Sequence, residues 1–202
     1  MKQRLFLSGF VALIAALPAV AQEPAVMQEP AVTQEPVPAF QASLTPEHAL
    51  YPRSQRIQGL TLSFWGENPQ TSLAIGLVNG STGESAGLSL GLANYAESYA
   101  GLQWSFANFA AQNFTGWQGG PLFGFLVSGV NFVGGDMRGL QLGAVNLAGK
   151  LSGLQLGLVN YCQRAESGVQ VGVINLIAEN QYWFSRWPNE VGPGMVLVNW
   201  RF

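Results

Sequence analysis

Few side chains in this chain are of the types that perform catalysis or bind metals. The 202 residues include one histidine, His48, and one cysteine, Cys162. A cysteine nucleophile needs a neighbouring base to activate it, and the segments around Cys162 contain no histidine. His48 has no cysteine, second histidine or paired carboxylates close to it in the sequence. The sequence therefore predicts no catalytic, cofactor or metal site, and we expect a protein that is not an enzyme.

The composition limits the partners that the chain can bind. Only 10% of the residues are charged, whereas 48% are apolar, and ordinary soluble domains carry about 25% charge. The formal net charge is −2, and no run of Lys or Arg follows residue 4. Because phosphate binding needs a basic patch, these numbers argue against nucleic acid. Either much of the outer surface meets something other than water, or Gln, Ser, Asn and Gly cover it.

Glutamine is the polar side chain that recurs with regular spacing, within a repeat whose consensus is Gly-Leu-Gln-Leu-Gly-Leu-Val-Asn. Clear units end at Asn79, Asn94, Asn108, Asn146, Asn160 and Asn175, and looser copies end at Asn131 and Asn199. Each unit alternates with a period of two residues, which is the pattern of β-strands. Bulky aliphatic residues and the asparagines share one predicted face, and Gln, Gly and small residues share the other. We therefore predict an all-β repeat domain over residues 57–202.

The repeat spacing favours an antiparallel meander closed into a small transmembrane β-barrel of 8–10 strands. Successive motif asparagines lie 15 and then 14 residues apart, as two different turn types at the two ends of a meander would produce. The aliphatic face would then contact outer-membrane lipid, and the opposite face would fill the lumen. The lumen-face candidates are Gln103, Gln141, Gln155 and Gln170.

A β-solenoid is the alternative architecture. In this arrangement each repeat forms one coil, the leucines face the core, and the asparagines stack as a ladder at an inner corner. The asparagines favour this alternative, because lipid tolerates a polar side chain on the aliphatic face only near the membrane interface.

The two ends of the chain indicate export. Residues 1–21 have a positive start, a short apolar run and a small-x-small site before Gln22, which together predict a cleaved signal peptide. Residues 22–52 form a Pro/Gln/Glu-rich segment with a six-residue repeat, which predicts a disordered linker.

At the other end of the chain, Val198, Trp200 and Phe202 alternate up to a terminal aromatic residue. This resembles the last-strand signal of outer-membrane barrels and implies the barrel-assembly machinery as a partner, although alignment on Asn199 places these residues on the Gln/Gly face.

The repeats, with the upstream segment 59–65, resemble a poorly characterised group of bacterial surface-repeat proteins. That resemblance covers about residues 57–177 and implies no activity. The pattern Gln141-x-Gly143-x-x-Asn146-x-Ala148 is also similar to the core of curli amyloid repeats. We therefore expect an outer-membrane barrel of structural or surface role. The alternatives are a secreted β-solenoid that adheres to a surface or self-assembles, and, third, a narrow channel for small uncharged solutes. No small-molecule ligand is indicated.

Overall fold

The computed structural model describes residues 36–202, except residues 121, 124–125, 128 and 185. The predicted signal peptide and the linker up to residue 35 lie outside the described residues. The described part is all-β, as the sequence predicts. The strands are β1 (Phe40–Thr45), β2 (His48–Ala49), β3 (Leu60–Glu67), β4 (Thr71–Leu90), β5 (Ala93–Trp104), β6 (Ala107–Ala110), β7 (Phe114–Gly119), β8 (Leu122–Phe123), β9 (Leu126–Val127), β10 (Val130–Leu142), β11 (Val145–Ile177) and β12 (Gly194–Arg201). The described residues contain no helix of the length and hydrophobicity that a membrane crossing requires.

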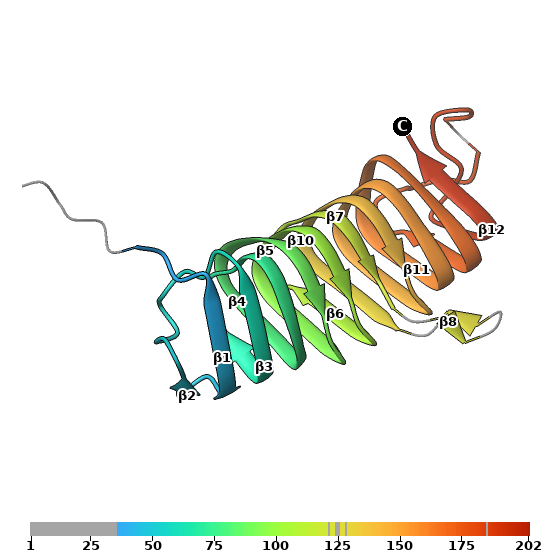
Figure 1. The fold of residues 1–202 in the computed structure, drawn as a ribbon. Helices are drawn as coiled ribbons and strands as arrows, with labels where there is room; N and C mark the ends of the chain where they lie inside the picture. The colour runs from blue at the N-terminus through green and yellow to red at the C-terminus, as the bar shows by residue number, and fades with distance from the viewer. Residues whose placement is uncertain (1–35, 121, 124–125, 128, 185) are drawn as a thin grey trace, which may run out of the picture. The chain divides into compact units, whose positions relative to one another are not determined.

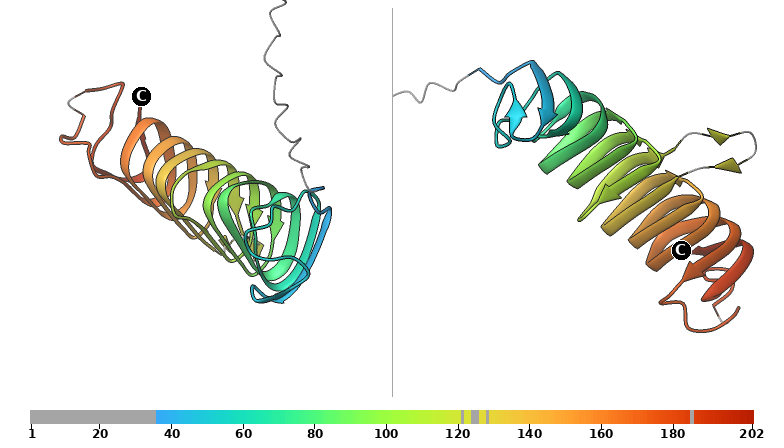
Figure 2. Two further views of the ribbon diagram at one scale, coloured as in Figure 1. Left: turned by 90° about the vertical axis from the view of Figure 1, so that its left-hand side faces the viewer. Right: turned by 90° about the horizontal axis from the view of Figure 1, so that it is seen from below.

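The repeats stack in parallel and in register, so the repeat domain is a β-solenoid (Figures 1 and 2). Asn131 pairs with Asn146, Leu140 with Leu154, and Gln141 with Gln155. The same parallel register joins β3 to β4 and β4 to β5. The predicted antiparallel barrel is therefore wrong, and the solenoid alternative is right about the architecture. In-register stacking of like side chains explains why the repeat keeps its sequence.

A corner inside each repeat places the asparagines on the opposite side from the one that strict alternation predicts. Gln155 and Asn160 are both fully buried, although they lie five positions apart in the sequence. Strict alternation would place them on opposite faces, but the chain bends between them at the Gly157-Leu158 corner. The glycine is required there, because a Cβ on Gly157 would lie 2.1 Å from the carbonyl oxygen of Gly143. The asparagines therefore face inward and the leucines outward. The predicted aliphatic core of the solenoid alternative is wrong in this respect.

The alternating 15- and 14-residue spacing also has a different cause. The stacked register shifts by one residue between Ser81 and Glu84, and again between Val133 and Asp136. The longer coils therefore carry one extra residue in the same turn. The interval of 23 residues between Asn108 and Asn131 contains an insertion at the opposite corner, which includes the β8–β9 hairpin.

Two columns of side chains make up the apolar core between the stacked segments. Small or aliphatic residues of one column lie against larger residues of the other. The cluster consists of Ala96, Tyr99, Ala110, Phe114, Val133, Met137, Ala148, Leu151, Cys162, Ala165 and Ile177. The Tyr99 and Phe114 rings are stacked, with their centroids 6.1 Å apart. Because this packing fills the described interior together with the inward amides, the predicted solute channel has no lumen to use.

Both ends of the solenoid are covered by other parts of the unit. At the N-terminal end, β1 pairs with β3, and Gln41 exchanges hydrogen bonds with the backbone of Tyr51. Residues 40–45 and 48–49 thus form strands, although the sequence analysis placed them in the linker. Buried Gln41 and Ser43 alternate with more exposed neighbours, but this short pattern lies next to a proline-rich segment. At the C-terminal end, β12 pairs antiparallel with β11.

Candidate interaction surfaces

The four predicted lumen-face glutamines lie inside the solenoid, where they form one hydrogen-bonded ladder with a fifth glutamine, Gln118. Each glutamine Nε2 donates to the Oε1 of the preceding one: Gln118 to Gln103 at 3.0 Å, Gln141 to Gln118 at 3.0 Å, Gln155 to Gln141 at 2.7 Å, and Gln170 to Gln155 at 2.8 Å. All five are essentially inaccessible to solvent. They are therefore structural and not available to a solute.

The asparagines form a second ladder of opposite polarity. Each asparagine Nδ2 donates to the Oδ1 of the following one, from Asn79 through Asn175, over 2.8–3.0 Å. Glutamine amides donate toward the N-terminal end and asparagine amides toward the C-terminal end, so the two rows of side-chain dipoles oppose each other. The last asparagine, Asn175, donates to the carbonyl oxygens of Gly172 and Met195, which links the ladder to β12.

Outward residues on either side of the glutamine ladder form a surface that we call face A. It consists of two columns of stacked residues. The first column contains Phe40, Leu60, Leu73, Leu88, Leu102, Trp117, Leu140, Leu154, Val169 and Trp200. The second contains Ala42, Leu62, Ile75, Leu90, Trp104, Gly119, Leu142, Leu156, Val171 and Val198. No Asp, Glu, Lys or Arg belongs to either column.

Outward residues on either side of the asparagine ladder form the corresponding face B. Its columns are Val78, Ala93, Ala107, Val130, Val145, Val159 and Ile174, and Tyr95, Phe109, Phe132, Leu147, Tyr161 and Leu176. Phe109 and Phe132 stack with centroids 4.8 Å apart. Face B is less uniformly apolar than face A, because the Tyr95 hydroxyl donates to the carboxylate of Glu67 at its N-terminal end.

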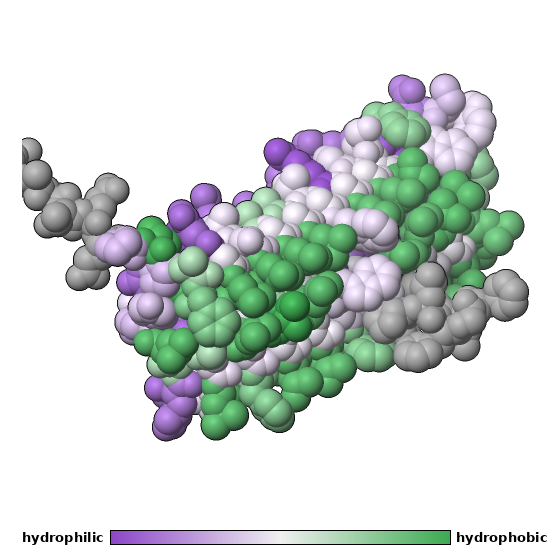
Figure 3. Space-filling view, in the orientation of Figure 1, coloured by the Kyte–Doolittle hydropathy of each residue, from purple (hydrophilic) through white to green (hydrophobic). Residues whose placement is uncertain are grey.

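Charged side chains gather along one edge, at the turn that carries the extra residue. Figure 3 shows hydrophilic residues along the upper edge of the solenoid and hydrophobic residues over the side below it. Across three coils, Asp136 contacts Lys150 at 3.6 Å, Lys150 contacts Glu166 at 2.9 Å, and Glu166 contacts Arg164 at 2.9 Å. The hydrogen bond from Lys150 lowers the pKa of Glu166. Because these charges pair with each other, the edge presents no field of one sign.

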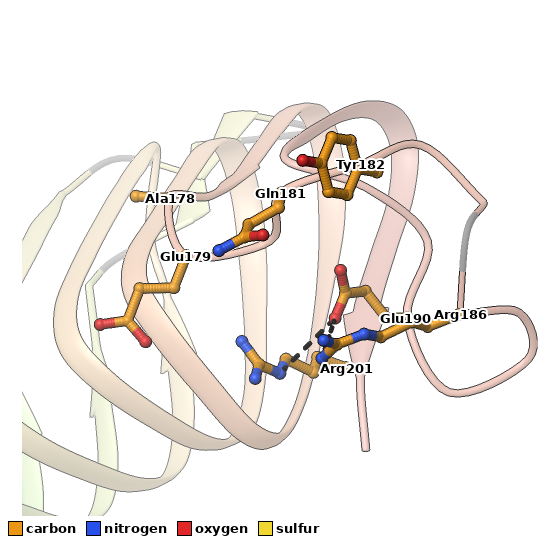
Figure 4. Close-up of a pocket in the computed structure, with 7 residues that line it drawn as sticks. All are labelled: Ala178, Glu179, Gln181, Tyr182, Arg186, Glu190 and Arg201. Atoms are coloured by element: carbon orange, nitrogen blue, oxygen red, sulfur yellow. Dashed lines mark ion pairs between the residues drawn. The ribbon is translucent and has the colours of Figure 1, made fainter.

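A polar pocket of about 390 Å³ lies at the C-terminal end, next to the loop that precedes β12 (Figure 4). Arg186 and Arg201 both point toward Glu190, with N–O distances of 3.9 and 3.8 Å. Glu179, Gln181 and Tyr182 complete the polar lining. The two arginines and two glutamates balance, so the pocket carries no net formal charge. Trp183 and Trp187 in the same loop are exposed.

The described residues contain no group of three or more His, Cys, Asp or Glu side chains placed to hold a metal ion. Cys162 is fully buried in the apolar core. Burial raises the pKa of its thiol to about 12, so the thiol stays protonated near neutral pH. The His48 ring lies at the exposed β1–β2 turn within 3.0 Å of the Thr45 hydroxyl.

The three predicted assembly-signal residues lie on β12 or directly after it. Val198 and Trp200 face outward in face A, Phe202 is exposed, and the residue between the first two, Asn199, is buried and donates to the carbonyl oxygen of Gly192. In the solenoid, this alternation serves to cover the last coil. The predicted assembly signal presupposed a barrel, which the fold does not support.

Sequence reasoning missed two features of these surfaces. It did not identify Gln118 as a ladder residue, because the insertion separates Gly116-Trp117-Gln118 from its asparagine; the Gly-x-Gln start of the unit was the available signal. It also missed the corner, and therefore placed the asparagines on the outward aliphatic face, which includes the leucines of face A. No family model, curated protein or solved structure matches this chain.

Proposed function

We propose that this chain is an exported β-solenoid of structural or surface role that binds through its apolar outer sides and performs no catalysis. The observation that carries the proposal is the division between its interior and its outside. Amides and small side chains fill the interior, whereas leucine, valine and aromatic side chains cover faces A and B.

The size of face A supports a binding role. Its ten rows of strands spaced about 4.8 Å apart, and a width of about four residues, give an area of about 650 Å². The largest apolar patch on a typical soluble monomer is about 300–600 Å² and is often functional. Face B adds a second, shorter apolar side. An uncovered surface of this kind promotes association, so we infer that a partner covers at least one of these faces.

Export can be tested by expressing the full chain in a Gram-negative host. We expect the chain outside the cytoplasm with Gln22 as its first residue, as N-terminal sequencing would show. Leu13→Arg, in the apolar run of the predicted signal peptide, should leave the precursor uncleaved inside the cell. Val26→Arg, in the predicted linker, is the matched control and should be exported normally. A wild-type chain that stays in the cytoplasm and still begins at Met1 would contradict the proposal.

A further inference from the structure

We infer that face A is the interface of a symmetric homodimer, in which two copies of this chain pack face to face around Trp104 and Trp117. The partner is thus a second copy of the chain. This inference names one partner for the proposed binding surface. Its test uses purified protein, so failure here and failure of the export assay are separate results.

The position of the two tryptophans supports a protein partner. β4 and β11 each cross face A twice, and β1, β3, β5, β7, β10 and β12 cross it once, which makes ten rows. Of the three tryptophans in face A, Trp104 lies in the fifth row and Trp117 in the sixth, at the centre of the face, whereas Trp200 lies in the last row. Residues that dominate binding energy cluster at the centre of interfaces and are enriched in Trp. At a membrane, by contrast, Trp concentrates at the boundary between the apolar and polar regions.

The two tryptophan rings project from an otherwise flat surface. The two rings lie edge to face, with centroids 6.1 Å apart. Trp104 covers Gly119, where a Cβ would lie 2.9 Å from the ring. In a two-fold dimer the same patch meets itself, so a ring that projects from one copy lies near the centre of the other. All rows have the same strand spacing, which lets the aliphatic columns on both sides of the rings interdigitate.

The area and the charge of face A fit a stable dimer. Two copies would bury about 1,300 Å² together, within the range of about 1,200–2,000 Å² that specific interfaces bury. Neither partner would bury a charged side chain, because face A carries none and the charged edge lies outside it. Face B is a weaker candidate for this contact, because Glu67 and the Tyr95 hydroxyl lie at one of its ends.

The oligomeric state of the purified protein, measured by light scattering and sedimentation, tests the inference. We expect a dimer with a Kd of about 1 µM or tighter. Trp117→Lys should weaken it at least about 30-fold. Phe109→Lys is the matched control on face B, since Phe109 is 44% exposed and Trp117 39%, and it should leave the dimer unchanged. Leu102→Lys, beside Trp117 in face A, provides a second dissociating variant if Trp117→Lys does not fold.

Three results would overturn the inference. The first is a wild-type protein that stays monomeric at concentrations well above the expected Kd. The second is a dimer that Phe109→Lys dissociates and both face A variants leave intact, because that would place the contact on face B. The third is a monomer that cosediments with phosphatidylcholine–phosphatidylglycerol vesicles and loses this binding with Trp117→Lys, because face A would then bind lipid and not a second copy.

Discussion

Replacing Asn146 by alanine is expected to lower the free energy of unfolding by about 3–5 kcal/mol. The Asn146 Nδ2 donates to the Asn160 Oδ1 at 2.8 Å and to the carbonyl oxygen of Leu156 at 2.9 Å, and its Oδ1 accepts from Asn131 at 2.8 Å. Alanine removes these bonds together with one to the carbonyl oxygen of Gly143 at 3.3 Å, and the side chains of Asn131 and Asn160, which lose their partner, are fully buried. Each buried polar group that loses its partner costs about 1–3 kcal/mol.

The matched control is Asn113→Ala. Asn113 is exposed, and its Oδ1 accepts one hydrogen bond, from the backbone N–H of Asp136. Because water can replace that bond, the loss should stay below about 1 kcal/mol. Urea unfolding of both variants, followed by circular dichroism, measures the difference. Equal losses for Asn113→Ala and Asn146→Ala would show that the asparagine ladder does not hold the coils together.

Replacing Gly139 by alanine should destabilise the protein even more, by upwards of about 4 kcal/mol, which is enough to prevent folding of a domain of ordinary stability. Gly139 has a φ of +124°, a conformation that residues with a Cβ rarely adopt. A Cβ would also lie 2.1 Å from the carbonyl oxygen of Gly116 in the neighbouring coil. The coils could accept the methyl group only by moving apart, which breaks the backbone hydrogen bonds between them.

Gly83→Ala separates the two causes of this loss. Gly83 also has a positive φ, of +60°, but a Cβ there would have no atom within 4 Å. We therefore expect a loss of only about 1–2 kcal/mol from the backbone conformation. Thermal unfolding of the two variants would measure the contrast. If Gly139→Ala were no less stable than Gly83→Ala, the close stacking of the glycine column would be wrong.

The sequence predicts the strands of this fold but not how they are joined. Alternation within Gly-Leu-Gln-Leu is a local property of a strand, so the all-β class and the repeat could be read directly. The alternation does not reveal the corner at Gly157-Leu158, because a glycine also fits the small-residue face of a continuous strand. The barrel followed from the alternating spacing of the asparagines and from the aliphatic face opposite the glutamines, whereas the placement of Asn160 on that aliphatic face favoured the solenoid.

The interior ladders explain why the fold is stable with amide side chains inside and aliphatic side chains outside. In a coil of 14 or 15 residues the stacked backbones lie close together, and there is little room for leucine on every inward position. An amide side chain fits because it bonds to the same residue of the next coil and to a backbone carbonyl, as Gln155 does with Gln141 and with Tyr161. The repeat therefore preserves its amides for stacking, and its leucines remain available for binding outside.

Parallel, in-register stacking of the coils is the central claim, and disulfide cross-linking of two cysteine pairs tests it most directly. In a Cys162→Ala background, the pairs would be Leu140→Cys with Leu154→Cys, and Leu142→Cys with Leu156→Cys. In the solenoid both pairs are direct neighbours on face A, at a strand spacing of about 4.8 Å that suits a disulfide. We predict that both pairs form cross-links within the monomer. In an antiparallel meander that places residue 140 opposite 154, residue 142 lies opposite 152, so a protein in which only one of the two pairs cross-links would contradict the solenoid.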